Sequence, residues 1–338
     1  MVLSLGSAGK DRIYENRKYF YLTIIRGNKV SKNSLVKLAK MTKKPLLAFI
    51  NPAKSLDKAI RFNHFMLLRN MLNHVKCDDL GVVIHSYGGD GDAAAQIAFL
   101  LRSQFEHLRG YVPYFAYSAA TVIALACDEI VMGDYSNIGP IDPQKFEESE
   151  KGLSSSLEIF ASINELRDIS IETYSKVLPT IQSLSNDRMG PMDDLKAARE
   201  FAIEFTGILA KDFPTEKLGR SKRAIQSIGD AARKILKENP IYYSDGFREC
   251  DDEKIDRIID KLQYSYSAHG YQIMRDEAES IGLPVVNATE KEQEIIDELS
   301  FTFSHLQDDM LVLIDPANKA AYEIEDGDLI GYALKDFK

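Results

Sequence analysis

The chain has 338 residues, of which 45% are hydrophobic and 28% are charged, and its formal net charge is −9. This composition suits a globular protein with a large core, and the acidic balance without a Lys/Arg-rich block argues against nucleic acid as a partner. No window holds the roughly 18 apolar residues of a membrane-spanning helix, and the start lacks the apolar region of a signal peptide. The three cysteines are scattered without C-x-x-C spacing, which is typical of reduced thiols. We therefore expect a cytoplasmic protein with no membrane span.

Strands and helices are expected to alternate over the first 148 residues. Residues 1–42 are predicted to form an N-terminal arm with a β-like run and a short amphipathic helix. The core is expected to begin at residue 43, with a strand over Pro45–Ile50 and a helix over Leu56–Leu72. A second apolar run, Leu80–Ile84, predicts another buried strand. This alternation indicates an α/β fold.

A turn with two consecutive glycines follows this second strand. The apolar run ends at Ser86-Tyr87-Gly88-Gly89, after which Asp92 is placed to cap a helix. Apolar residues at intervals of three and four continue to Leu108. The segment therefore predicts one strand-turn-helix unit.

A serine occupies the next strand-to-helix corner. The predicted strand Tyr111–Tyr117 ends at Ser118, and the apolar residues that follow it predict a buried helix. A hydroxyl at a helix start faces unpaired N–H groups and the positive end of the helix dipole, which favour negative charge. Such charge develops on the carbonyl oxygen during acyl transfer. Ser118 is therefore the predicted nucleophile.

The two glycines of the turn can provide a second backbone N–H that stabilises the negative charge on the carbonyl oxygen. Because Gly88 and Gly89 lack a Cβ, their backbone can closely approach a substrate carbonyl. We expect the N–H groups of Gly89 and Ala119 to form an oxyanion hole, with Gly88 in the same turn. Loss of one such donor typically costs about 3 to 4 kcal/mol of transition-state stabilisation.

Three ordered motifs resemble the serine dehydrogenase proteinase family, which is similar to signal peptide peptidase A and, more distantly, to the Clp protease proteolytic subunit. The motifs are IHSYGGDGDAAAQIA (84–98), VPYFAYSAATVIALACDEIVMG (112–133) and SNIGPIDPQ (136–144), with a weaker match over 267–285. The resemblance implies a ClpP/crotonase-like α/β spiral of ββα units with a helical layer. It also implies hydrolysis of peptide bonds by an activated serine. The six histidines show no H-E-x-x-H or paired spacing, so no metal site is expected, and no cofactor is expected either.

The motifs leave the general base open. No histidine occurs between Ser118 and His269, which excludes a Ser-His-Asp triad in the Clp order. Resemblance to signal peptide peptidase A implies a Ser-Lys dyad, in which a desolvated lysine on a helix follows the serine by roughly 50 residues. Lys176 is the preferred lysine, His269 and Asp142 are alternative bases or orienting groups, and His85 is expected to face away from Ile84's side of the sheet. The other lysines in range are Lys145, Lys151 and Lys196.

Longer helices are expected after residue 148. Apolar spacing predicts helices over Leu157–Ile169, Tyr174–Leu184, Leu195–Leu209, Arg275–Ile281 and Glu290–Leu306, with breaks at Gly190-Pro191 and Phe213-Pro214. Gly282 is a typical C-cap for the fourth of these helices. The tail alternates as strands Met310–Ile314 and Ala320–Ile324 and a third run, Leu329–Leu334. We expect an arm over 1–42, a peptidase domain over 43–286, and a C-terminal helix with a small β appendage over 287–338.

Three functions remain open on the sequence alone. The first is a serine peptidase that acts on peptides or proteins and assembles as a homo-oligomer. The second is a catalytically silent scaffold or peptide-binding protein with the same fold. The third is a crotonase-type acyl-CoA enzyme, which is disfavoured because residues 118–121 hold no acidic side chain. A nucleophilic serine separates the first function from the other two.

Overall fold

The computed structural model describes residues 32–51, 59–147, 152–185, 190–211, 213–239, 251–266, 270–306, 309–325 and 328–333. The chain forms two compact units. The larger unit comprises Met1–Ile141 and Ile228–Lys338, and the smaller comprises Asp142–Ser227. This division differs from the predicted segments, because the contacts of the larger unit join residues from both ends of the chain.

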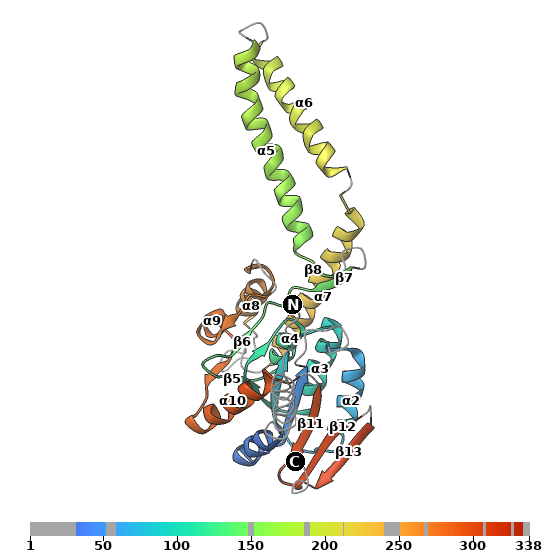
Figure 1. The fold of residues 1–338 in the computed structure, drawn as a ribbon, viewed down its shortest axis with the longest axis vertical. Coiled ribbons are helices and arrows are strands. Elements are labelled where there is room, and N and C mark those ends of the chain that lie inside the picture. The colour runs from blue at the N-terminus through green and yellow to red at the C-terminus, as the bar shows by residue number, and fades with distance from the viewer. Residues whose placement is uncertain are drawn as a thin grey trace, which may run out of the picture. The chain divides into compact units, whose positions relative to one another are not determined.

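A mixed sheet forms the centre of the larger unit (Figure 1). Its strand order is β10-β5-β3-β2-β1-β11-β12-β13, with the short strands β4, β6 and β9 branching from β2. The parallel strands are β1 (Leu46–Asn51), β2 (Asp79–Ser86), β3 (His107–Val112), β5 (Glu129–Met132) and β10 (Val285–Asn287). The antiparallel additions are β11 (Met310–Asp315), β12 (Ala320–Glu325) and β13 (Asp328–Ala333). The branch consists of β4 (Phe115–Ala116), β6 (Asn137–Ile138) and β9 (Ile273–Met274).

Alternate residues of each strand enter two different cores. In β1, Leu47 and Phe49 join one apolar cluster, whereas Leu46 and Ile50 join the other. This alternation follows from the two-residue period of a strand and places helices over both faces of the sheet. The first cluster includes residues of α2 (Phe62–Leu72), α3 (Gly91–Gln104), α4 (Ala119–Ala124), α7 (Thr215–Glu238) and α8 (Asp252–Tyr264). The second includes residues of α10 (Glu290–Phe303) and of the helical segment 32–42.

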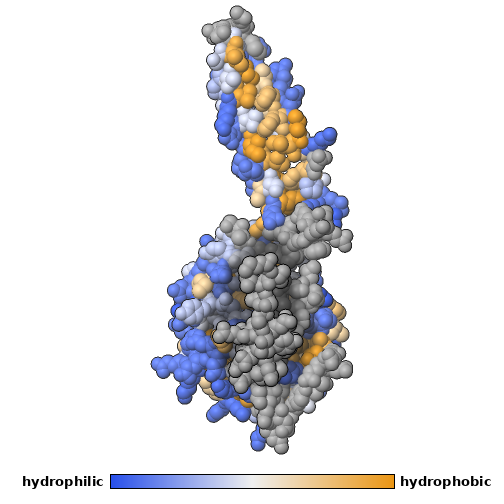
Figure 2. Space-filling view, viewed as in Figure 1, coloured by the Kyte–Doolittle hydropathy of each residue, from blue (hydrophilic) through white to orange (hydrophobic). Residues whose placement is uncertain are grey.

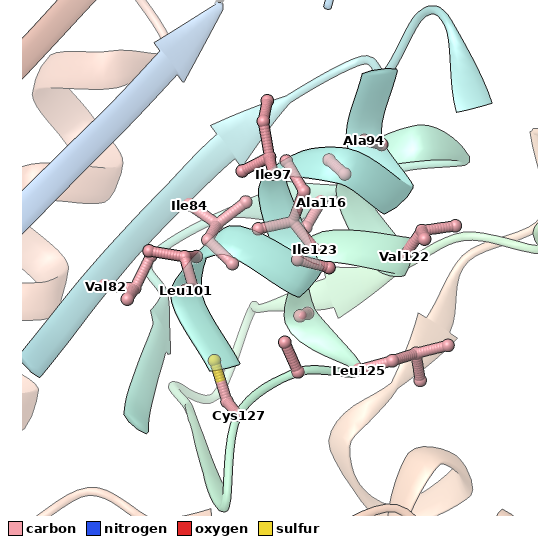
Figure 3. Packing of buried hydrophobic residues seen from close by; sticks show 14 of the residues in the cluster. Val82, Ile84, Ala94, Ile97, Leu101, Ala116, Val122, Ile123, Leu125 and Cys127 are labelled. Carbon is pink, nitrogen blue, oxygen red and sulfur yellow. The ribbon is translucent and has the colours of Figure 1, made fainter. Parts of the chain in front are cut away.

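The first cluster holds the elements that carry the diglycine turn and Ser118. Val82 and Ile84 of β2 share it with Ile97 of α3 and Ile123 of α4, and all four side chains are fully buried (Figure 3). Each large apolar side chain buried in this way contributes roughly 1.5–3 kcal/mol. The sheet and both helices are therefore held rigidly at the turns between them.

The cap of α3 differs from the predicted one. The helix begins at Gly91, and its N-cap is Asp90, whose side chain accepts a hydrogen bond from the Ala93 N–H at 2.9 Å. Asp92, the predicted cap, lies in the first turn of the helix. A carboxylate in either place favours a helix start, so local pattern alone does not separate the two.

Both predicted terminal segments contribute to the larger unit. Leu35 and Leu38 of the 32–42 helix are completely buried in the second cluster, so this part of the predicted arm packs into the core. Strand β11 pairs with β1, with Leu313 opposite Leu47, so the predicted β appendage extends the central sheet. The predicted helix over 275–281 is confirmed as α9 (Arg275–Ile281), and Gly282 ends it with a left-handed φ of 103°.

The smaller unit contains a long helical hairpin. Its elements are β7 (Gln144–Glu147), β8 (Gly152–Ser155), α5 (Glu158–Ser185), α6 (Pro191–Ala210) and the first part of α7. The breaks predicted at residues 190–191 and 213–214 are confirmed, because α6 begins at Pro191 and α7 at Thr215. The two helices predicted before residue 185 are one continuous helix, α5, which includes Pro179. None of the described helices is both long and apolar enough to cross a bilayer.

His85 occupies an apolar site on the second face of the sheet. Its ring centroid lies 4.2 Å from that of Phe115 and 5.1 Å from that of Phe303, so it faces away from Ile84's side as predicted. Both ring nitrogens are buried, and neither has a hydrogen-bond partner among the described residues. This burial lowers the pKa of His85 from 6.5 to about 3.

We predict that His85→Phe reduces the loss of stability in acid. The unfolded chain binds a proton at His85 below about pH 6.5, whereas the folded chain stays neutral there until about pH 3, so stability falls as pH decreases between these values. Between pH 7 and pH 5 the wild type should lose about 2 kcal/mol more than the variant. Urea unfolding at both pH values measures this. The exposed His107 offers the control His107→Phe, which should behave as wild type; identical pH dependence in all three proteins would refute the assignment.

Candidate active site

Ser118 has a strained backbone at the corner between β4 and α4. Its φ is 53° and its ψ is −116°, a combination that L-residues rarely adopt. The residue is half-buried and is the N-cap of α4, but its side chain makes no capping hydrogen bond. Serine nucleophiles of other hydrolases also sit on sharp, strained strand-to-helix turns. Ser118 therefore occupies a strained corner of the kind that the predicted nucleophile requires.

The first glycine of the diglycine turn is in direct contact with this corner. Gly88 has a φ of +99°, and a Cβ added to it would lie 2.6 Å from the Tyr117 carbonyl O and 3.0 Å from the Ser118 Cβ. The same position is 3.1 Å from the Ala119 backbone N. No side chain fits between the two turns, so Gly88 brings the backbone of β2 against the start of α4.

The N–H of the second glycine, Gly89, points away from Ile60, whose backbone pairs with the turn. The Ile60 N–H donates to the Gly88 carbonyl and the Asp90 N–H donates to the Ile60 carbonyl, both at 2.9 Å. In an extended backbone the intervening N–H and C=O of Gly89 point to the opposite side. Neither the Gly89 N–H nor the Ala119 N–H forms a hydrogen bond within the described parts of the chain. The residue after Ser118 and the residue after Gly88 thus each carry a backbone N–H without a partner among the described residues.

The Gly88 N–H has a different role from the expected one. It donates to Ser86 Oγ at 3.0 Å, so it is engaged in holding the turn. Ser86 also accepts the Tyr117 N–H at its carbonyl, at 2.9 Å, which ties β2 to the residue before the nucleophile. Gly88 therefore provides the close approach, while Gly89 and Ala119 provide the available donors.

Ser86 and Thr121 fix the corner, and neither role was predicted from the sequence. Thr121 Oγ1, completely buried in α4, lies 2.8 Å from both the Ala116 and the Gly139 carbonyl oxygens. It thereby links the helix to β4 and to the residue after β6. A short polar residue inside an apolar helix is a sequence signal for such a tether, because a buried hydroxyl needs a partner.

Aromatic rings lie beside the corner on the second face of the sheet. Tyr87 and Tyr117, the residues before Gly88 and Ser118, have ring centroids 6.0 Å apart. Phe115 contacts both, at 4.4 Å from Tyr87 and 4.9 Å from Tyr117. Tyr87 is 38% exposed, so the site has an accessible aromatic wall.

The candidate bases lie in separate parts of the chain. Lys176 is on α5 of the smaller unit, where its side chain is 74% exposed and pairs with Glu172 at 2.5 Å. This environment does not supply the desolvation that a lysine base needs. Lys196 is also exposed, on α6, and Asp142 is buried at the start of the smaller unit. His269 and Lys151 lie outside the described residues, and Lys145 is in β7.

Cys127 is completely buried, and burial raises the pKa of its thiol to about 12, so it is a core residue. Among the described residues no group of three His, Cys, Asp or Glu side chains is arranged to hold a metal ion.

These features define a ClpP-like α/β fold with a serine at a strained corner. The comparison with protein families agrees: residues 63–217 match the model of the ClpP-like SDH-type serine proteinases, which confirms the resemblance found in the motifs. The match includes the diglycine turn, Ser118 and the α5–α6 hairpin. At the level of the family it supports a serine peptidase.

Individual relatives share part of their length with this chain. It is 29% identical to uncharacterized protein MJ0137 of Methanocaldococcus jannaschii over 44% of this chain and 53% of that protein. It is 27% identical to MJ1495 of the same organism, over 48% and 56% respectively. The chain thus spans about half the length of these curated relatives. A solved structure, the 1510-N membrane-bound stomatin-specific protease, matches at 16% identity over 40% of this chain and 61% of that chain, with a TM-score of 0.25.

We predict that an alanine at either glycine of the turn disables the site. Gly88→Ala displaces the corner of Ser118, and Gly89→Ala places a Cβ 2.3 Å from the Ile60 backbone N. A misplaced donor should slow acylation of Ser118 by a serine-directed probe about 100-fold or more, as loss of one oxyanion donor does. Adduct formation followed by intact mass measures the rate. Gly207→Ala is the control, since nothing lies within 4 Å of its Cβ position; equal rates in all three variants would contradict the role of the turn.

Proposed function

We propose that this chain is a serine peptidase that hydrolyses peptide bonds through Ser118, the Gly89 and Ala119 amides and a general base. The observation that carries the proposal is the strained φ of 53° at Ser118 together with the close approach of Gly88 to it. Backbone strain of this kind costs roughly 1–3 kcal/mol and persists where a function requires it. The family-level match supports the same class of reaction.

The proposed reaction has two halves. In the first, Ser118 Oγ attacks the carbonyl carbon of the scissile bond while its proton moves to the base, and the carbonyl oxygen becomes negatively charged. The Gly89 and Ala119 N–H groups donate hydrogen bonds to this oxygen. The C–N bond then breaks, the leaving amine takes the proton, and an ester with Ser118 remains. In the second half, water attacks the ester with the same assistance and releases the acid product.

The general base is proposed to be a lysine, and Lys176 is the preferred candidate. A lysine acts as a base only when its ammonium loses a proton, and burial is the ordinary cause of the necessary fall in pKa. Lys176 is exposed and forms an ion pair with Glu172, so its side chain is not buried in this way. Lys176 can therefore serve only if a substrate or another protein surface covers it.

The aromatic wall and the free Gly89 edge support a peptide or protein substrate. An extended segment can pair with the unused Gly89 N–H and C=O, as in strand addition to a sheet edge. The same edge also suits the alternative function, a silent peptide-binding scaffold. By analogy with similar peptidases, we further propose that the enzyme acts as a homo-oligomer.

We expect a fluorophosphonate probe to label the full chain at Ser118. The adduct should add one probe mass, map to the peptide that contains residue 118, and disappear in Ser118→Ala. Ser136→Ala is the matched control, because this completely buried serine is remote from the corner in sequence. A folded wild-type protein that gains no adduct between pH 7 and pH 10 would favour the silent scaffold.

Removal of the true base should slow labelling without unfolding the chain. We predict that Lys176→Ala lowers the adduct rate about 100-fold, within the range for general base catalysis. Lys196→Ala and His269→Ala are read alongside it, and the variant with the largest loss identifies the base. Unchanged rates in all three variants would remove the proposed dyad and leave the nucleophile assignment untouched.

A further inference from the structure

Three aromatic rings lie next to the two turns of the candidate site. Tyr87 immediately precedes Gly88, and Tyr117 immediately precedes Ser118. Phe115 contacts both tyrosines, with its ring centroid 4.4 Å from that of Tyr87 and 4.9 Å from that of Tyr117. Consecutive Cα atoms are about 3.8 Å apart, so these rings begin one residue from the nucleophile and from the diglycine turn. We call Tyr87, Phe115 and Tyr117 the aromatic wall.

The ring of Tyr117 is held in place by three contacts. It is nearly parallel to the ring of Phe115, with an angle of 12° between the two planes. Gly139 makes room for it, because a Cβ at that position would lie 3.0 Å from Tyr117 Cδ1. The Tyr117 hydroxyl forms a hydrogen bond with the side chain of Gln272, which the pairing of β6 with β9 brings close. The wall is therefore formed before a ligand arrives, and binding to it costs little ordering of the protein.

The ring of Tyr87 makes the wall accessible. Tyr87 is 38% exposed, whereas Phe115 is 6% exposed and anchors the rings on the sheet. Exposed apolar side chains also gather along the α5–α6 hairpin (Figure 2), but these belong to the smaller unit. The aromatic wall differs from them because it continues directly into both turns of the site. Sites for small groups are typically lined by aromatic and apolar side chains of this kind.

The groups that form and support the wall are uncharged at neutral pH. Burial raises the pKa of Tyr117 above its ordinary value, so its phenol keeps its proton. His85, whose ring centroid is 4.2 Å from that of Phe115, has a pKa of about 3 and is neutral as well. A charged side chain that moved onto this surface would lose hydration without gaining an ion pair from these residues. The wall therefore favours a neutral side chain.

The arrangement of the rings favours an aromatic side chain over an aliphatic one. Aromatic rings attract one another in offset or tilted pairs at centroid distances of about 4.5–7 Å, beyond the gain from buried area. The wall already contains both kinds of pair, because Tyr87 is tilted by 49° from Phe115 and Tyr117 is nearly parallel to it. A fourth ring on Tyr87 would extend this arrangement, whereas an aliphatic group would gain only from its area.

We propose that the aromatic wall binds an aromatic side chain of a peptide substrate, in the residue that bears the scissile carbonyl or in its direct neighbour. An extended peptide that pairs with the unused Gly89 edge directs alternate side chains to opposite faces of the sheet, and one set faces the wall. Tyr87 provides the accessible contact and decides the selectivity. This inference rests on the serine peptidase proposed above and names the class of substrate that it accepts.

Peptide binding to the full chain with Ser118→Ala tests the proposal without turnover. Short alanine-rich peptides carry phenylalanine, cyclohexylalanine or lysine at one central position, and fluorescence anisotropy gives their affinities. Cyclohexylalanine matches phenylalanine in size but has no aromatic ring. The phenylalanine peptide is expected to bind about three- to tenfold more tightly than the cyclohexylalanine peptide, the factor that ring pairs typically provide. The lysine peptide should bind most weakly.

A second substitution assigns this preference to the wall. Adding Tyr87→Leu should abolish the difference between phenylalanine and cyclohexylalanine, because leucine keeps an apolar surface but removes the ring. Tyr135→Leu is the matched control, since Tyr135 is 75% exposed and lies between β5 and β6, outside the wall. It should leave the preference unchanged.

The outcomes separate this inference from the proposed peptidase. Equal affinities for phenylalanine and cyclohexylalanine, a preference that survives Tyr87→Leu, or no binding of any peptide would overturn the wall as a subsite, even if a fluorophosphonate labels Ser118. A lysine peptide that binds as tightly as the phenylalanine peptide would overturn it in favour of a cation site. An intact preference in a chain whose Ser118 is never labelled would refute the peptidase and support the wall as a surface that binds aromatic side chains.

Discussion

The approach of Gly88 to the start of α4 is the constraint on which the site depends. At this point the backbone of one strand-to-helix turn lies against the backbone of another, with no room for a Cβ. The contact brings the turn that carries Gly89 against the residues that carry Ser118 and Ala119, and the Ser86 hydroxyl and carbonyl reinforce it. Both turns end strands that are buried on their two faces, so neither can relax without disturbing the core. The geometry of the corner is thus held by packing at some distance from it.

Local pattern was sufficient to predict the elements that carry this contact. The apolar run of β2 ends in glycines, and the apolar helix after Ser118 begins without a polar loop, so both corners were visible in the sequence. The helix end at Gly282 and the break at Pro191 were equally local, because a left-handed C-cap and a proline act through their own backbone. His85 was placed on the correct face by strand alternation alone.

Other features could not be predicted because they depend on residues distant in the chain. The pairing of β11 with β1 joins segments more than 250 residues apart, and nothing in either segment specifies the other. The Thr121 tether requires the carbonyl of Gly139, which only the folded branch of β4 and β6 brings near. In both cases the partner lies far away in the sequence, and only the fold brings it near. The shifted cap of α3 has a local cause instead, because Asp90 and Asp92 are two nearby carboxylates and either favours a helix start.

The proposed reaction requires a base that becomes neutral near Ser118. A lysine in water is deprotonated in only about one molecule in 2,500 at pH 7, so a serine-lysine pair works only where water is excluded. Ser118 is only half-buried at its strained corner, so the corner alone does not provide such shielding. Lys176 belongs to a helix whose apolar residues are also largely uncovered, including Ile171, which is 59% exposed. A surface that covers this helix would remove water both from its apolar residues and from the Lys176 ammonium. Assembly of the protein and activation of the proposed base would then have the same cause.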